Sequence, residues 1–200
     1  MANLIITIIS VALVAVAAIM GSWYGGQAFQ SGQAKARATK IVSDQNQLAA
    51  AWHLYALNNG MSYRMPSGYT HITFWSDVMV PQYLNSVPRA SFYQAEAFNP
   101  QASYINKSTG TLHSATTIIE GNAVNIYLLT ESHSWTVCHE YIALAGEAGA
   151  YVPRSPPGYA ISFSSVDFDK VQWICMFNDV DTSGDPSPGD VGFYFYYIIR

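Results

Sequence analysis

The stretch of sequence best suited to chemistry is NDVDTSGDPSPGD, residues 178–190. Its oxygen-bearing side chains alternate along the chain around Gly184, as they do in loops that bind calcium. Candidate ligands for Ca²⁺ are Asp179, Asp181, Ser183, Asp185 and Asp190. Pro186, Pro188 and the lack of flanking helical patterns depart from an EF-hand. A solvated turn between two strands fits the same residues, so both interpretations stay open. Ca²⁺ is the one cofactor that the sequence suggests.

The two cysteines are the next chemically distinctive residues. Cys138 and Cys175 form an even pair in a part of the chain rich in short elements. Such a pair favours a disulfide formed outside the cytoplasm. The alternative is two buried thiols.

No pattern of residues indicates catalysis. The triplet Cys138-His139-Glu140 places a nucleophile beside a base, but adjacent residues on a helix point in different directions. The other histidines are scattered, and the chain has no Walker loop, GxSxG or HExxH sequence. We expect that the protein is not an enzyme.

These residues lie in a region of short predicted elements, residues 59–200. Trp75 to Leu84 reads as a short helical segment, closed by Pro88, and residues 89–121 are polar and rich in turns. A second short helix is expected from Ser134 to Gly146. Strands rich in β-branched and aromatic residues are expected at 123–130, 159–166, 171–177 and 191–199. The predicted class is α+β, with helices on one side of an antiparallel sheet.

The first 58 residues read as a single long helix. The largely apolar run from Leu4 to Met20 is about 26 Å long as a helix, which is just sufficient to span a bilayer. It has no basic residue before it, so a membrane anchor is favoured over a secretory signal. Residues 27–59 contain no proline, and Asn58, Asn59 and Gly60 supply a stop. An apolar stripe is expected along this second half, made by Ile41, Leu48, Trp52 and Tyr55, with Ala51 and Leu57 nearby.

Residues 1–34 carry no charged side chain, although those after Trp23 would lie beyond the hydrocarbon. Gly21, Gly25 and Gly26 cluster in this stretch, and each glycine inside a helix costs about 1 kcal/mol. We predict a break between Met20 and Gln27. A hinge beside the membrane and an uncharged helix that packs against copies of itself both fit these residues.

Composition limits the partners. Only 11% of residues are charged, whereas about a quarter is usual for soluble domains, so some surface is expected to lie in lipid or against other subunits. The net charge is −4 and no basic stripe appears, which argues against nucleic-acid binding.

Taken together, the chain resembles a type IV pilin, most closely of class b. The resemblance rests on the uncharged N-terminal helix with its amphipathic continuation, the VPQYLNSVP segment, the sheet domain, and the pair Cys138 and Cys175. It covers nearly all of the chain. It implies a pilin fold, in which residues 1–58 form a spine helix and residues 59–200 a globular head.

The resemblance also implies partners and a location. A prepilin peptidase would remove a basic leader, leaving Met1 as an N-methylated terminus. The subunit would wait as a single-span protein in the inner membrane. The pilus assembly machinery would then add it to a helical homopolymer outside the cell. A glutamate is usual at the fifth position of mature pilins, but here Ile5 stands there, so Asn3, Thr7 or backbone carbonyls would have to solvate the terminal amine.

Other functions remain open. The missing glutamate fits a minor pilin or pseudopilin that initiates or caps a filament. A single-span, membrane-anchored adhesin is a second alternative, but it leaves the uncharged stretch beyond the bilayer unexplained. The sequence does not distinguish adhesion, conjugation, motility and phage attachment as roles of a filament.

Overall fold

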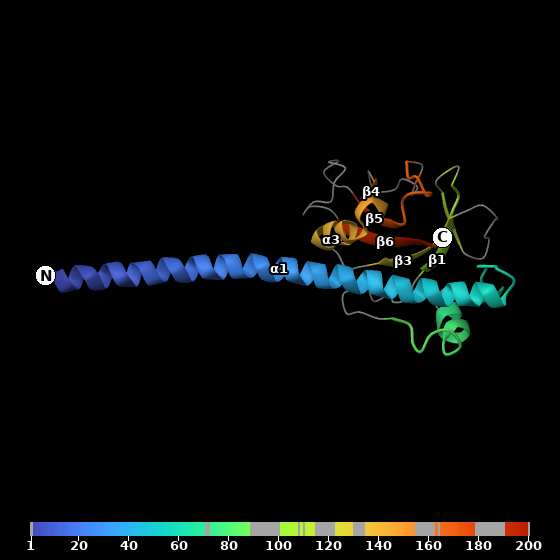
Figure 1. Cartoon of the computed structure of the whole chain (residues 1–200), viewed down its shortest axis with the longest axis horizontal. Coiled ribbons are helices and arrows are strands. Elements are labelled where there is room, and N and C mark those ends of the chain that lie inside the picture. Colours follow the sequence, from blue (N-terminus) through green and yellow to red (C-terminus); the bar gives the residue numbers. More distant parts are fainter. Residues whose placement is uncertain are drawn as a thin grey trace.

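In the computed structural model, the described residues are 2–70, 73–88, 101–107, 109, 111–114, 123–129, 135–154, 163, 165–178 and 191–199. A single helix, α1 (Ala2–Asn58), runs from the N-terminal end of the chain and along the head (Figure 1). With 57 residues and a rise of 1.5 Å per residue, it is about 86 Å long. The predicted long helix is therefore confirmed.

The predicted break in this helix is wrong for the isolated chain. α1 continues without interruption through Gly21, Gly25 and Gly26. A Cβ added at any of these three glycines would meet nothing within 4 Å, so the glycines serve no close approach within the chain itself. A glycine costs a helix about 1 kcal/mol. That penalty does not interrupt a helix flanked on both sides by good helix formers.

α1 ends where the sequence predicts a stop. Gly60 has φ of 66° and Met61 has φ of 64°, both in the left-handed region. The backbone N–H groups of Asn59 and Met61 donate to the carbonyl of Ala56, at 3.0 and 2.7 Å. This closes the last turn of α1 and sends the chain back along it.

The described part of the head forms one mixed sheet of six strands. In chain order they are β1 (Gln101–Ile105), β2 (Leu112–Ser114), β3 (Ala123–Leu129), β4 (Gly149–Arg154), β5 (Trp173–Asn178) and β6 (Val191–Ile199). Their order across the sheet is β2-β1-β3-β6-β5-β4. The described pairings are antiparallel except that of β4 with β5, which is parallel.

Three predicted strands correspond to β3, β5 and β6, and the α+β class is confirmed. The prediction of a wholly antiparallel sheet is wrong, because the unpredicted strand β4 joins the edge in parallel to β5. β4 contains Gly149, Pro153 and Arg154, which weaken a strand signal, and its place at the edge makes proline tolerable. β1 and β2 lie in a segment predicted to be turns. Most of the predicted strand 159–166 lies outside the described residues.

The helices of the head are short. α3 (Trp135–Ala145) confirms the helix predicted from 134 to 146, and a single turn, η4 (Gly146–Ala148), joins it to β4. The π-helical turn η1 (Phe74–Met79) overlaps the first half of the predicted helical segment 75–84, and the second half of that segment is not helical. In the view of Figure 1 the sheet lies above α1 and η1 below it, although both contribute to one hydrophobic core.

Side chains alternate strictly between two hydrophobic cores on the two faces of the sheet. Cys175, Phe177, Phe193 and Phe195 point toward α1, α3 and η1. Residues 174 and 176 of β5, and residues 194, 196 and 198 of β6, point to the other face, where Phe163 and Phe168 cover them. Because both faces are covered, the central strands read as nearly continuous apolar runs.

A candidate assembly surface on the long helix

α1 divides into two parts with opposite surroundings. Every side chain from residue 7 to residue 33 is exposed, and we call these residues the bare segment. From Ala34 onward the helix packs into the head, and we call residues 34–58 the docked segment. Figure 1 shows the bare segment projecting from the head with no other element beside it.

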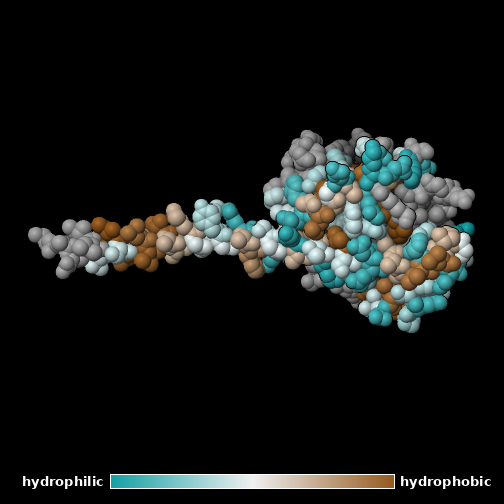
Figure 2. All heavy atoms as spheres, in the orientation of Figure 1, coloured by the Kyte–Doolittle hydropathy of each residue, from teal (hydrophilic) through white to brown (hydrophobic). Residues whose placement is uncertain are grey.

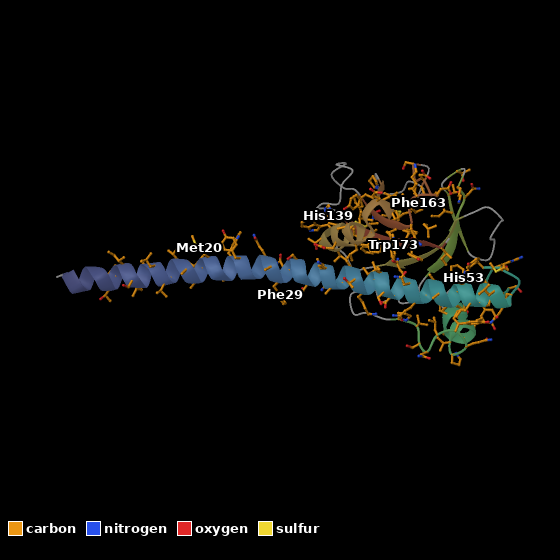
Figure 3. The ribbon with its side chains drawn as sticks, viewed as in Figure 1. Met20, Phe29, His53, His139, Phe163 and Trp173 are labelled. Atoms are coloured by element: carbon orange, nitrogen blue, oxygen red, sulfur yellow. A yellow bond between two sulfur atoms is a disulfide. The ribbon has the colours of Figure 1, made fainter. Side chains whose placement is uncertain are left out.

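The bare segment exposes large apolar side chains along nearly its whole length. Eleven of them are at least 49% exposed: Ile8, Ile9, Val11, Leu13, Val14, Val16, Ile19, Met20, Trp23, Tyr24 and Phe29. Figure 2 shows the most hydrophobic surface in the half of the bare segment farther from the head, and Met20 and Phe29 project freely from the helix in Figure 3. Exposed apolar surface of this extent marks a contact with lipid or protein.

These side chains point in all directions around the helix. Successive residues of a helix are about 100° apart, so residues 8, 9, 11, 13 and 14 together cover every side. A helix that meets a single partner needs only one apolar stripe, whereas one that is apolar all round is surrounded. The bare segment is therefore suited to lipid or to several neighbouring helices at once.

The bare segment is also longer than a bilayer requires. Its 27 residues span about 40 Å, compared with a hydrocarbon core of about 30 Å, and none of them is charged. Within the described part of the chain, α1 is the helix that is long and apolar enough to cross a membrane. A membrane anchor and a secretory signal both meet that criterion.

The docked segment holds the head to the helix through one regular stripe. The buried residues recur at alternating spacings of four and three: Ala34, Ala38, Ile41, Gln45, Leu48, Trp52 and Tyr55. The four large side chains predicted for this stripe are all buried, and Ala51 is buried beside them. The prediction for Leu57 is wrong, because it lies on the solvent side of the last turn and is half exposed.

A polar bridge ties this stripe to the sheet. Gln45 Nε2 donates to the carbonyl of Phe195 at 2.7 Å, and the Tyr141 hydroxyl lies 2.7 Å from Gln45 Oε1 and 2.9 Å from the carbonyl of Tyr196. Burial raises the pKa of the Tyr141 phenol well above its usual value, although the hydrogen bond to Gln45 acts in the opposite direction. The phenol therefore stays neutral at any physiological pH. This bridge was not predicted, and its one signal in the sequence is a glutamine, Gln45, inside an apolar stripe.

A second polar contact lies at the same level of the helix. Asp44 is almost fully buried and pairs with Lys40 one turn earlier, whose side chain is still partly exposed. This spacing favours an ion pair along a helix. The Asp44 carboxylate is therefore buried against the head with the Lys40 ammonium still beside it.

The predicted disulfide is present. Cys138 of α3 and Cys175 of β5 are bonded, with their Cα atoms 5.8 Å apart. The bond fixes α3 to the sheet one turn before Tyr141, so it also helps to hold the helix that carries the polar bridge. Because Cys138 is oxidised, Cys138-His139-Glu140 contains no thiol that could act as a nucleophile.

The histidines that the structure places have ordinary packing roles. His139 Nδ1 lies 3.0 Å from the Tyr151 hydroxyl, and its ring stands edge-on to Trp135. His53 is paired with the hydroxyl of Tyr63. Figure 3 shows His53 and His139 at separate places in the head.

The predicted calcium ligands Asp179, Asp181, Ser183, Asp185 and Asp190 lie outside the described residues. Within the part that is described, no three His, Cys, Asp or Glu side chains gather as a metal site. Met1 and the side chains of residues 2–6 also lie outside that part, and with them the solvation expected for the terminal amine.

The geometry assigns separate tasks to the two parts of α1. The docked segment positions the head, and the bare segment offers an uncharged apolar surface that the chain itself leaves uncovered. Comparisons with protein-family models, with curated proteins and with solved structures find no match to this chain.

Proposed function

We propose that the protein is a structural subunit of an extracellular filament of the type IV pilus kind. The observation that carries this proposal is the bare segment, which is uncharged throughout, apolar on all sides as far as Met20, and longer than a bilayer is thick. A spine that is surrounded by copies of itself explains all three properties. A simple anchor explains only the first part of its length.

Lipid serves as the partner of the bare segment before assembly. Helices leave lipid for one another only when they pack closely, since lipid is as apolar as the helices are. Small residues allow that close packing, and the bare segment contains Ala12, Ala15, Ala17, Ala18, Gly21, Gly25 and Gly26. Since the three glycines have no close neighbour within the chain, their use would lie between chains.

The disulfide supports a head that folds outside the cytoplasm. Bonds such as that between Cys138 and Cys175 form and persist in oxidising compartments. On this proposal the chain passes from a single-span membrane form to a helical homopolymer, with a prepilin peptidase and the pilus assembly machinery as its partners. Attachment to surfaces or to other cells is the expected use of the filament.

A pair of matched substitutions tests the proposal. Ala28→Glu puts a carboxylate into the bare segment beyond the expected bilayer, where burial against other helices would cost several kcal/mol. Ala36→Glu makes the same change on an exposed position of the docked segment, beside Lys35 and Arg37. We expect Ala28→Glu to abolish filaments and Ala36→Glu to leave them. Electron microscopy of sheared cell-surface material, with mass spectrometry of its main subunit, provides the measurement.

The same pair separates the alternatives. A membrane-anchored adhesin would tolerate both substitutions and form no filament in either case, a result that contradicts the proposal. A minor pilin would appear as a trace component of filaments made from another subunit. Membrane fractionation confirms that each variant is made and inserted.

A further inference from the structure

The far end of the head carries a shallow groove that assembly through the bare segment does not use. We call it the tip groove; its volume is about 660 Å³, and it is lined by Tyr55, Asn58, Asn59, Pro66, Tyr69, Val78, Gln82 and Tyr83. It lies where the last turns of α1 meet the chain around η1. We infer that the tip groove binds a neutral oligosaccharide.

The groove combines the two kinds of side chain that sugars require. Tyrosine rings offer flat apolar faces on which the C–H faces of a pyranose pack, and each ring ends in a hydroxyl. Carboxamides supply a donor and an acceptor side by side, as neighbouring sugar hydroxyls need. Three tyrosines and three carboxamides line one groove of a volume usual for small-ligand sites. Tyr55 is buried and its hydroxyl donates to the carbonyl of Arg64, so Tyr69 and Tyr83 are the tyrosines that offer ring faces to a ligand.

Hydrogen bonds and ring contacts within the groove hold several of these side chains in place. The ring of Tyr55 stands edge-on to those of Phe74 and Tyr83, with centroids 5.4 and 5.8 Å away. Asn58 Nδ2 donates to the Tyr83 hydroxyl at 3.2 Å, and Asn59 Nδ2 donates to the carbonyl of Tyr55 at 2.8 Å. A surface ordered in advance loses less entropy when a ligand binds.

Other groups in the groove remain available for a ligand. Gln82 is exposed and makes no side-chain hydrogen bond within the described part of the chain. Tyr69 is 37% exposed and has no described ring partner. Asn58 and Asn59 each donate through the NH₂ group of the side chain. Within the described part of the chain, their carboxamide oxygens accept no hydrogen bond. These groups form the polar part of a recognition surface.

Charge and location limit the ligand further. None of the described residues that line the tip groove is charged, which favours a neutral sugar over an acidic one. Tyr55 lies about 33 Å along the helix from Gln33, the last residue of the bare segment. Packing of the bare segment against lipid or other helices therefore does not cover the groove.

Titration with defined sugars tests the inference. The full chain is held in lipid nanodiscs and titrated with N-acetyllactosamine, chitotriose and mannotriose, with binding followed by saturation-transfer NMR. We expect at least one of them to bind. Tyr69→Ala should weaken binding about tenfold, and Gln82→Ala several-fold, because each removes an exposed groove side chain.

Two further variants serve as controls. Tyr69→Trp keeps an aromatic face and should retain binding, whereas Gln47→Ala removes an exposed glutamine of the docked segment outside the groove and should change nothing. No binding of any sugar at millimolar concentration overturns the inference. So does unchanged affinity in Tyr69→Ala, or binding of a proline-rich peptide in place of the sugars.

Discussion

The bare and docked segments belong to one continuous helix, and each contains a tryptophan. Trp52 is fully buried and contacts the rings of Tyr63, Phe74 and Trp75, whereas Trp23 is 68% exposed. The difference lies in how the apolar residues are distributed. In the docked segment they form one stripe among polar residues such as Lys35, Arg37 and Lys40. In the bare segment they surround the helix, and one head domain cannot cover all sides.

The two segments should therefore contribute to different properties, the docked segment to stability and the bare segment to assembly. Residues of the docked segment should determine how stable the head is. Residues of the bare segment should leave the isolated fold unchanged and act only when lipid or other chains are present.

The largest effect is expected from replacing the two tryptophans. Trp52→Ala should lower the free energy of unfolding of the head by about 3–5 kcal/mol, because it opens a cavity among three aromatic rings. Trp23→Ala should change it by less than about 0.5 kcal/mol. Chemical denaturation followed by near-ultraviolet circular dichroism measures both. Equal losses in the two variants would contradict the division of α1.

Removal of the disulfide should have a comparable effect confined to the head. The two cysteines are 37 residues apart, for which loop-closure entropy gives about 4 kcal/mol. The double variant Cys138→Ser, Cys175→Ser should lose about that much stability and keep its helical bare segment. Intact mass with and without reductant checks the bond in the natural chain, and two free thiols there would remove the basis of this prediction.

A smaller loss is expected at the polar bridge. Tyr141→Phe removes the hydroxyl that serves Gln45 and the carbonyl of Tyr196, and should cost about 1–3 kcal/mol. Tyr24→Phe in the bare segment is the matched control and should cost nothing measurable. A loss in the control equal to that of Tyr141→Phe would show that the bridge has no special role.

The same tyrosine predicts a dependence on alkaline pH. Burial raises the folded-state pKa of Tyr141, so its contribution is fully present below the unfolded value of about 10. Above that pH the unfolded chain loses the phenol proton first, and stability should fall as pH rises. Tyr55 and Tyr63 shift in the same direction through burial. Denaturation midpoints measured above neutral pH should decline less steeply in Tyr141→Phe than in the natural chain.

The smallest effect is expected at the glycines. Gly25→Ala and Gly26→Ala should each stabilise the helix by about 1 kcal/mol, and slow amide exchange in residues 20–27 about fivefold, without changing head stability. Gly149→Ala is the contrasting control, since its Cβ would lie 2.9 Å from Ile142 Cγ2 and 3.1 Å from the Ile142 carbonyl. That variant should destabilise the head. Unchanged exchange at Gly25 and Gly26 would show that the glycines do not weaken the helix.

Much of the fold follows from local patterns. The long helix, its stop at Gly60, α3 and three strands could be predicted because propensity and periodicity act within a few residues of one another. β4 could not be, because its sequence GAYVPR is a poor strand by composition and becomes one by pairing with β5. The interruption predicted at the glycines does not occur. Each glycine lowers the local stability of the helix, but no other structure competes with the helix there.

The candidate sites divide in the same way. The cysteine pair was visible in the sequence, but its geometry depends on α3 lying over β5. The polar bridge joins residues 45 and 141, and the tip groove joins residues 55–59 to 66–83. Such sites combine separate segments, and no pattern within one segment signals them.

The sequence by itself determined that this chain has a long uncharged apolar helix followed by an α+β head, because hydrophobic periodicity and charge are properties of composition and order. Only the tertiary structure decided where the helix leaves the head. Burial of α1 begins at Ala34, because the surface formed by α3, the sheet and η1 reaches along the helix only that far. Beyond that face no described side chain of the head covers the helix, and its apolar surface is exposed to lipid or to other copies.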